Sequence, residues 1–204
     1  MKKTLLALAI VAALAAGQNA YATPVTQTFA DTAIIWDGWS AQVNDSTSEN
    51  IGFPKIESTS VSMDEHTLTK IVFNLSETYL GVDSGDLFID ANADKTWDYV
   101  VKTLNYGLNT TSTAYLYAIN AGLTDFGKYE TSAIPGGRIG HATGLEDMTA
   151  ASILGTVSYV AQGGPTYSPG FVSFDFAGLN APLSFTSDFI IGYTFTCAND
   201  VVYE

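Results

Sequence analysis

The sequence predicts an all-β fold, namely a single-domain antiparallel β-sandwich or jelly roll with one short helix. Charged residues make up only 14% of the chain, whereas Thr, Ser, Gly, Tyr and Phe are abundant, which is the composition of β-proteins. Several segments alternate apolar and polar residues with the period of two that is typical of strands. Gly, Pro, Asn and Asp separate these segments at short intervals, as expected for many short strands joined by turns.

The first 22 residues have the pattern of a secretory signal peptide. Lys2 and Lys3 precede an apolar run from Leu5 to Ala16, and a polar stretch then ends in Ala20-Tyr21-Ala22. Small residues at the last and third-last positions suit a signal peptidase. The apolar run is shorter than the roughly 18 residues that a membrane-spanning helix needs. We therefore expect residues 1–22 to be removed and residues 23–204 to form one secreted domain without a membrane span.

The charge balance excludes one class of function. The formal net charge is −13, and removal of the leader takes away two basic residues and no acidic residue. Such a surface repels nucleic acid and attracts cations. The single cysteine, Cys197, excludes a disulfide framework within the chain, and we expect its thiol to be buried. His66 and His141 are too far apart in the sequence to indicate a zinc site.

The elements predicted after the leader follow the alternating segments. The Thr- and Val-rich start, 23–35, is an extended segment suited to pairing with the sheet edge of a neighbouring molecule. One helix is predicted at 147–154, because Asp147 can cap it and Gly155 can end it. The other predicted strands cover 67–75, 86–89, 97–101, 113–119, 155–161, 171–176 and 189–196.

The most specific motif in the chain is a predicted calcium loop. Calcium takes about six to eight oxygen ligands, and alternate residues of a tightly curled loop can supply several of them. The carbonyl of Thr96 fits position 7 of such a loop. Oxygen-bearing side chains occupy positions 1, 3, 5 and 9, which are Asp90, Asn92, Asp94 and Asp98. We therefore expect Ca²⁺ to bind at this bend between two strands.

Two departures from an EF-hand matter here. Lys95 stands where an EF-hand has its glycine, and Val101 stands where it has a bidentate glutamate. Because the flanks are predicted strands, the loop needs a further ligand, for which Asp86 and Asp83 are the nearest candidates. The alternative interpretation is a plain hairpin turn, in which Asp and Asn side chains bond to their own backbone.

Other constellations are weaker. Trp36 and Trp39 flank a turn, and they could stack on a sugar ring if exposed or pack in the core if buried; Trp97, Tyr115 and Tyr117 leave the same alternatives open. The chain has no Gly-x-Ser-x-Gly and no His-Glu-x-x-His pattern.

Two features could belong to a hydrolase. His141 lies in a glycine-rich stretch, and Glu146 with Asp147 forms one of several acidic pairs. Neither has a visible partner that would complete a catalytic site. We therefore expect no catalytic residues and no enzyme.

Three stretches resemble exported bacterial proteins of the PEP-CTERM, or exosortase-dependent, type. The resemblance implies an extracellular or surface β-sandwich, of unassigned biochemical role and often linked with biofilm or matrix. It also implies that the turn near the end is a family feature, in which Asn199 and Asp200 serve the fold or a second ion. The stretches are Trp36-Asp37-Gly38-Trp39, Gly85 to Asp90 running into Asp98 to Val101, and Thr196-Cys197-Ala198-Asn199-Asp200-Val201.

Members of that family continue past this turn into a Pro-Glu-Pro signal, an apolar helix and a basic tail, whereas the sequence given stops at Glu204. We therefore expect secretion or assembly into matrix rather than exosortase anchoring. The favoured hypothesis is a secreted, calcium-stabilised structural or biofilm-matrix protein that contacts itself or an extracellular polysaccharide. The alternatives are a carbohydrate-binding module and, less favoured, an unrecognised hydrolase.

Overall fold

The computed structural model describes the chain from Pro24 to Tyr203 with gaps. The predicted leader, Trp36, Trp39, Asp147 and Asn199 lie outside the described residues. The described ranges are 24–31, 54–78, 83–103, 107, 109–123, 129–131, 141–146, 148–149, 151–164, 167–198 and 200–203.

The described residues form twelve strands and no helix. Within them there is accordingly no helix of the length and apolar character needed to cross a bilayer. The strands are β1 (Val25–Ala30), β2 (Lys55–Asp64), β3 (Thr67–Glu77), β4 (Ser84–Asp90), β5 (Trp97–Thr103), β6 (Thr110–Leu123), β7 (Tyr129–Thr131), β8 (Ala142–Leu145), β9 (Ala151–Gln162), β10 (Gly170–Asp175), β11 (Ile190–Phe195) and β12 (Val201–Tyr203).

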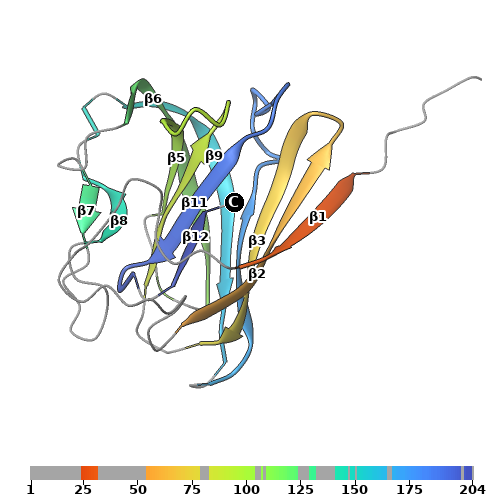
Figure 1. Ribbon diagram of the computed structural model, residues 1–204, viewed down its shortest axis with the longest axis vertical. Coiled ribbons are helices and arrows are strands. Elements are labelled where there is room, and N and C mark those ends of the chain that lie inside the picture. Colours follow the sequence, from red (N-terminus) through yellow and green to blue (C-terminus); the bar gives the residue numbers. More distant parts are fainter. Residues whose placement is uncertain are drawn as a thin grey trace, which may run out of the picture.

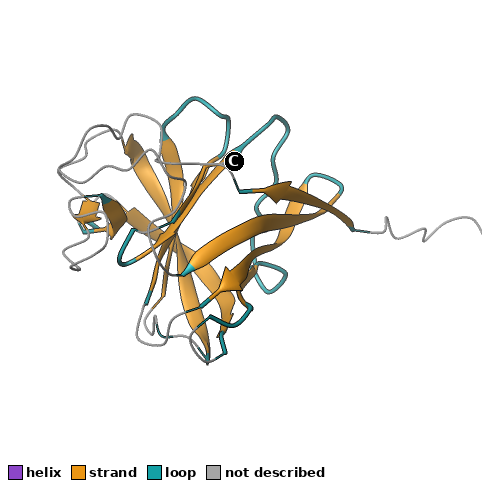
Figure 2. Cartoon of the chain, turned by 60° about the horizontal axis from the view of Figure 1, so that its bottom comes forward, coloured by secondary structure: helices purple, strands orange, loops and turns teal. Residues whose placement is uncertain are grey.

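Ten of the strands form one antiparallel sheet. Their order is β1-β2-β3-β10-β9-β6-β5-β4-β11-β12, and β7 pairs with β8 in a separate small ribbon. The large sheet curls like half a barrel, so that strands from its two ends come to face each other (Figures 1 and 2). The all-β prediction is confirmed. The finer prediction of two facing sheets is not confirmed, because ten of the twelve described strands belong to one curled sheet.

The predicted helix at 147–154 is wrong. Residues 151–154 begin the long strand β9, where Ser152 pairs with Ala118 and Ala151 with Ile119 of β6. A helix of two turns is only marginally stable by itself, whereas β6 offers this segment a full ladder of backbone hydrogen bonds. The neighbouring strand therefore decides the conformation, against the capping pattern in the sequence.

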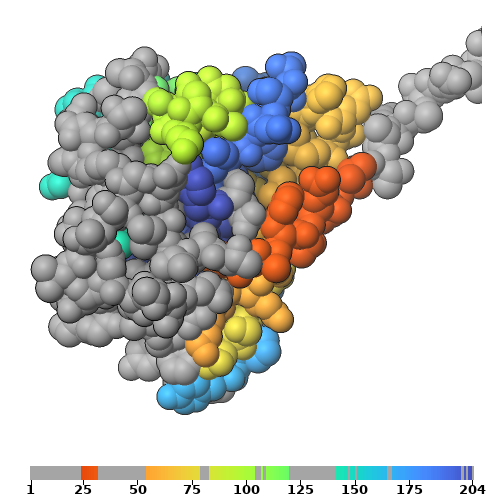
Figure 3. Space-filling view, in the orientation of Figure 1, coloured from red at the N-terminus to blue at the C-terminus, as the bar shows by residue number. Residues whose placement is uncertain are grey.

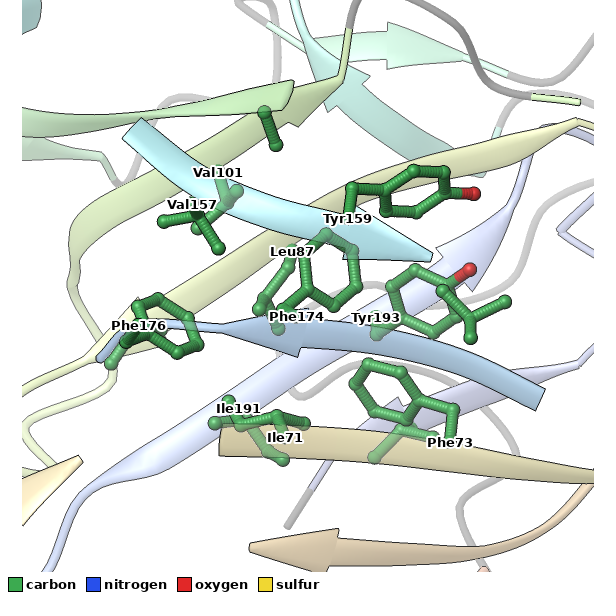
Figure 4. Packing of buried hydrophobic residues seen from close by; sticks show 14 of the residues in the cluster. Ile71, Phe73, Leu87, Val101, Val157, Tyr159, Phe174, Phe176, Ile191 and Tyr193 are labelled. Carbon is green, nitrogen blue, oxygen red and sulfur yellow. The ribbon is translucent and has the colours of Figure 1, made fainter. Parts of the chain in front are cut away.

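The main core fills the concave side of the curled sheet (Figure 4). Phe73 of β3 stacks on Tyr193 of β11, with ring centroids 4.1 Å apart and an interplanar angle of 10°. Phe174 of β10 meets both rings edge-on. Since β3 and β11 are separated by five strands in the sheet order, these contacts exist only because the sheet curls. Cys197 is buried at the edge of this core, as predicted.

A second, smaller core lies between the other face of the sheet and the β7–β8 ribbon. It contains Phe88, Trp97 and Val100 from the sheet and Ala142 and Leu145 from β8. The ribbon lies close to the sheet at Gly85, where a Cβ atom would come within 2.4 Å of the Thr143 carbonyl oxygen and 2.7 Å of the Thr194 carbonyl oxygen. Glycine is therefore required for β8 to pack here.

Gly85→Ala should lower the free energy of unfolding by about 1–3 kcal/mol, because two backbone carbonyls must move to admit the methyl group. Gly178→Ala is the matched control, since nothing lies within 4 Å of its Cβ position, and it should change stability by less than about 0.5 kcal/mol. Chemical denaturation of both variants checks this. Equal stabilities of the two variants would contradict the close packing of β8 on β4.

Two tyrosine hydroxyls lie at one end of the main core and point the same way (Figure 4). Tyr193 shares a 2.8 Å hydrogen bond with Ser84. Burial raises the pKa of Tyr159 to about 12; the neighbouring Ser84 hydroxyl lowers it, and the charge of Asp83 raises it. Burial also raises the pKa of Tyr193 well above its usual value, and the nearby Tyr159 adds to this. Both side chains must therefore stay protonated in the folded protein.

Stability should fall at alkaline pH for this reason. An unfolded tyrosine has a pKa of about 10, below the folded value. The stabilisation that the protonated tyrosines give to the folded state is therefore fully present below pH 10 and is lost as the pH rises through about 12. The double variant Tyr159→Phe, Tyr193→Phe cannot ionise at these positions. Thermal melts between pH 8 and 12 should show a shallower decline for this variant than for the wild type, whereas parallel curves would contradict the burial of the hydroxyls.

Candidate functional site

The predicted calcium loop is the turn between β4 and β5. Leu87, Phe88 and Ile89 pair with Val101, Val100 and Tyr99, and continuing this register sets Asp90 opposite Asp98 at the base of the loop. Asp90 is only 1% exposed. Two carboxylates directly opposite each other in a strand pair repel, and burial of one strengthens the repulsion. The base of this hairpin therefore brings two acidic side chains onto facing strand positions.

The loop backbone curls around the Asp90 carboxylate. Its Oδ1 accepts the N–H groups of Asn92 at 3.2 Å and Asp94 at 3.3 Å, and its Oδ2 accepts the N–H of Lys95 at 2.7 Å. Across the base, Oδ2 of Asp98 accepts the N–H of Ala91 at 2.8 Å. Asp90 is thus the residue around which the turn is organised.

The other predicted side chains lie on the same loop. The Asn92 side chain accepts the N–H of Asp94 at 3.2 Å and donates to Asp94 Oδ2 at 3.1 Å. Asp94 Oδ1 accepts the N–H of Thr96 at 2.9 Å. Asn92 and Asp94 are exposed, and Asp98 is half-buried. The turn thus gathers Asp90, Asn92 and Asp94 through mutual hydrogen bonds, which are the bonds expected of a turn stabilised by its own Asp and Asn side chains.

Two residues of the loop have left-handed backbone conformations, Ala93 with φ 56° and Lys95 with φ 70°. Lys95 occupies the position at which an EF-hand has its glycine. The chain therefore makes the sharp turn of such a loop while carrying a side chain that disfavours it.

Asp86 does not belong to this loop. It lies four residues before Asp90 on an extended strand, roughly 13 Å away at about 3.3 Å per residue. Its Oδ2 forms a 2.7 Å ion pair with Lys102 and accepts the N–H of Leu145 at 2.8 Å. Lys102 also donates to the Leu145 carbonyl at 2.8 Å. The prediction of Asp86 as a calcium ligand is therefore corrected: its carboxylate fastens β8 to β4 and β5.

Asp83 precedes β4, farther still from the loop, and its carbonyl accepts the N–H of Thr196 at 2.9 Å. Across the part of the chain that the structure describes, no group of three or more His, Cys, Asp or Glu side chains lies together as a metal cluster. Any ion at the turn would therefore depend on mixed ligands, including the Asn92 amide oxygen and the Thr96 carbonyl.

Asp200, which the family resemblance assigned to the fold or to a second ion, is fully buried. Its carboxylate accepts the N–H of Ile56 at the start of β2, and its carbonyl accepts the Thr194 hydroxyl at 2.6 Å. The first bond ties the turn before β12 to β2 on the opposite arm of the curled sheet, and the second ties it to the neighbouring strand β11. Asp200 thus serves the fold, a role that the sequence alone could not distinguish from ion binding.

The other candidate sites have less support. Trp97 is 7% exposed and packs against Phe88 and Tyr203, so it offers no open platform for a sugar ring. Tyr117 packs against the same small core. Of the predicted aromatic candidates, Tyr115 is half-buried, and Trp36 and Trp39 lie outside the described residues. His141 is 3% exposed, which does not suit a general base in an open loop.

The Asp86–Lys102 pair and the Tyr159–Tyr193 end of the core were missed in the sequence. The contacts of Asp86 join residues 16 and 59 positions apart, and the Ser84–Tyr193 bond joins residues 109 positions apart. No local pattern in the sequence marks either. No family model, no curated protein and no solved structure matches this chain. Any function of this protein is therefore to be inferred from the geometry of the site.

Lys95→Gly should raise the free energy of unfolding by about 1 kcal/mol, because glycine adopts the left-handed conformation without steric cost. Lys95→Ala is the control, since it removes the charge but keeps a Cβ atom at positive φ, and it should give no such gain. Chemical denaturation without added metal measures both. A gain of similar size in both variants would assign the effect to the charge instead of the backbone.

Proposed function

We propose that this protein is an exported structural protein of the cell surface or extracellular matrix, whose β4–β5 hairpin is stabilised by Ca²⁺. One observation carries the proposal: Asp90 is buried at the base of the hairpin, opposite Asp98, with Asn92 and Asp94 turned onto the same loop. A divalent cation would relieve the repulsion that this arrangement creates.

The residues that would hold the ion are all on the loop. Asp90, Asn92, Asp94 and Asp98 supply side-chain oxygens, and Thr96 supplies its carbonyl. Water would complete the shell of about six to eight oxygens. Hard oxygen donors of this kind suit Ca²⁺ better than zinc or copper, which prefer nitrogen and sulfur.

A bound ion would act on stability. The loop joins two neighbouring strands within the ten-stranded sheet, so an ion that fixes the loop also fixes the register of β4 and β5. The single cysteine leaves the chain with no internal disulfide. A metal bound only by the folded state adds RT ln(1 + [L]/Kd) to the free energy of unfolding.

The extracellular setting follows from the leader pattern of residues 1–22 and the strongly acidic composition. The resemblance to PEP-CTERM proteins supports the same compartment and a role in matrix or biofilm. In that setting the protein would work by contact with other copies of itself or with envelope polymers. This proposal needs no catalytic group.

Calcium should raise the melting temperature of the mature protein, and a chelator should lower it. At a calcium concentration a thousand times the Kd, the gain is about 4 kcal/mol. Asp90→Asn combined with Asp94→Asn should abolish the effect, because the amides retain the size of the side chains but lose the charge. Differential scanning calorimetry with and without calcium measures it.

Two control variants accompany this experiment. Asp175→Asn changes an aspartate that caps an ordinary turn by accepting the N–H of Ala177, and Asp86→Asn changes the carboxylate paired with Lys102. Both should retain the calcium-dependent shift in melting temperature. A wild-type protein with the same melting temperature in calcium and in chelator would contradict the proposal and favour a plain hairpin turn.

A further inference from the structure

Strand β1 forms one edge of the ten-stranded sheet and is open to solvent. Within the described residues its only hydrogen-bonded neighbour is β2. All six residues from Val25 to Ala30 are exposed, and even Phe29 is 37% exposed. Figure 3 shows the strand lying uncovered along the surface. An exposed strand edge is a template for pairing with another chain.

The register identifies which backbone groups face outward. Asp31 donates its N–H to the carbonyl of Glu57, the residue directly opposite when the β1–β2 register is continued. Hydrogen-bonded pairs alternate along antiparallel strands, so the odd-numbered residues of β1 bond to β2. The N–H and C=O groups of Thr26, Thr28 and Ala30 therefore point away from the sheet.

The side chains bear this out. Thr26 and Thr28 share hydroxyl hydrogen bonds with Ser62 at 2.8 Å and with Ser60 at 3.0 Å. Such bonds suit the closer, non-hydrogen-bonded pairs of an antiparallel ladder. On the other face, Gln27 and Phe29 line a groove of about 320 Å³, whose other lining residues are the polar Ser187 and Asp188 and the apolar Val61, Met63, Phe189 and Ile191. One face of β1 is thus a row of hydroxyl groups, and the other is apolar around Gln27.

The charge pattern points to a second copy of this chain as the partner. The whole chain carries a net charge of −13, so most faces of two copies repel each other. β1 has the sequence VTQTFA, with no charged residue. These six residues also include no lysine and no proline, which commonly protect an edge strand, although Pro24 directly precedes them. The edge is therefore a place where two acidic copies can meet without like charges in the strand.

The strand is also complementary to itself. When two copies pair antiparallel about Gln27, the outward-facing groups of Thr26 in one copy meet those of Thr28 in the other. Val25 then lies opposite Phe29 of the second copy, which is a favourable pairing of a β-branched and an aromatic residue. At the end of the strand, the carbonyl of Pro24 can accept the N–H of Ala30, whereas proline has no N–H for the Ala30 carbonyl, so each end of the pairing forms one hydrogen bond instead of two.

We propose that two copies associate through β1, antiparallel and about a two-fold axis at Gln27, to join their sheets into one. This inference deepens the proposed structural function and rests on it, because it names the surface through which copies meet. A two-fold contact uses the same strand on both copies and closes on itself. The opposite edge, β12, has only three residues, so this contact gives dimers and not fibres.

Cysteine cross-linking tests the register directly. Gln27 would lie opposite Gln27 of the second copy in a non-hydrogen-bonded pair, with Cα atoms about 4.5 Å apart. This distance is within the range of a disulfide. Gln27→Cys should form covalent dimers under mild oxidation at least about ten times faster than Thr113→Cys, an exposed position on the inner strand β6. The native Cys197 is buried, and the wild type serves as its control.

A second pair of variants tests the backbone pairing without a cross-link. Thr28→Pro removes an outward N–H, a change that an edge strand tolerates, and it should weaken the dimer at least tenfold. Thr28→Val keeps that N–H and should retain the dimer. Since a six-residue strand pair is a small interface, we expect a Kd on the order of 100 µM, which sedimentation velocity up to millimolar protein can measure.

The outcomes separate this inference from the calcium proposal. Equal cross-linking of the two cysteine variants, or a wild type that stays monomeric at millimolar concentration, would overturn the dimer. Larger species instead of dimers would overturn the two-fold geometry. The calcium-dependent shift in melting temperature is measured on the same samples. A protein that responds to calcium but stays monomeric would therefore overturn the dimer and leave the calcium proposal standing.

Discussion

The stacking of Phe73 on Tyr193 is the contact on which the rest of this structure depends. The two rings come from strands that are far apart in the sheet order, and they meet face to face at 4.1 Å. A flat sheet would leave both rings in water, whereas the curled sheet buries them along with Phe174 and Tyr159. Burial of such rings is a large stabilising term in a core, and it requires the curl.

Polar contacts then fix the curl that the apolar core requires. Asp200 bonds to the N–H of Ile56 and joins the two arms of the sheet. On the other face, Asp86 and Lys102 hold Leu145 of the ribbon. These groups are buried or nearly so, and each forms a bond to a specific partner that offsets part of the cost of burial. Together they select one closure of the sheet from the many that apolar packing alone would permit.

The proposed calcium loop and the proposed dimer edge use opposite properties of this scaffold. The loop concentrates negative charge at a turn that two inner strands hold in place, which favours a cation. The β1 edge is uncharged in an otherwise acidic chain, which favours another copy of itself. The two lie on different strands, because β4 and β5 are inner strands of the sheet while β1 lies at its end.

The sequence by itself determined the all-β class, the burial of Cys197 and the turn at Asp90 to Asp98, because alternation, composition and Asp/Asn spacing act over a few residues. Only the tertiary structure decided that the strands form one curled sheet, that residues 151–154 belong to a strand, and that Asp86 binds Lys102 and not the loop. Those outcomes depend on which strands become neighbours. Neighbouring strands are chosen by the packing of residues such as Phe73 and Tyr193, 120 positions apart along the chain, and no local pattern encodes that choice.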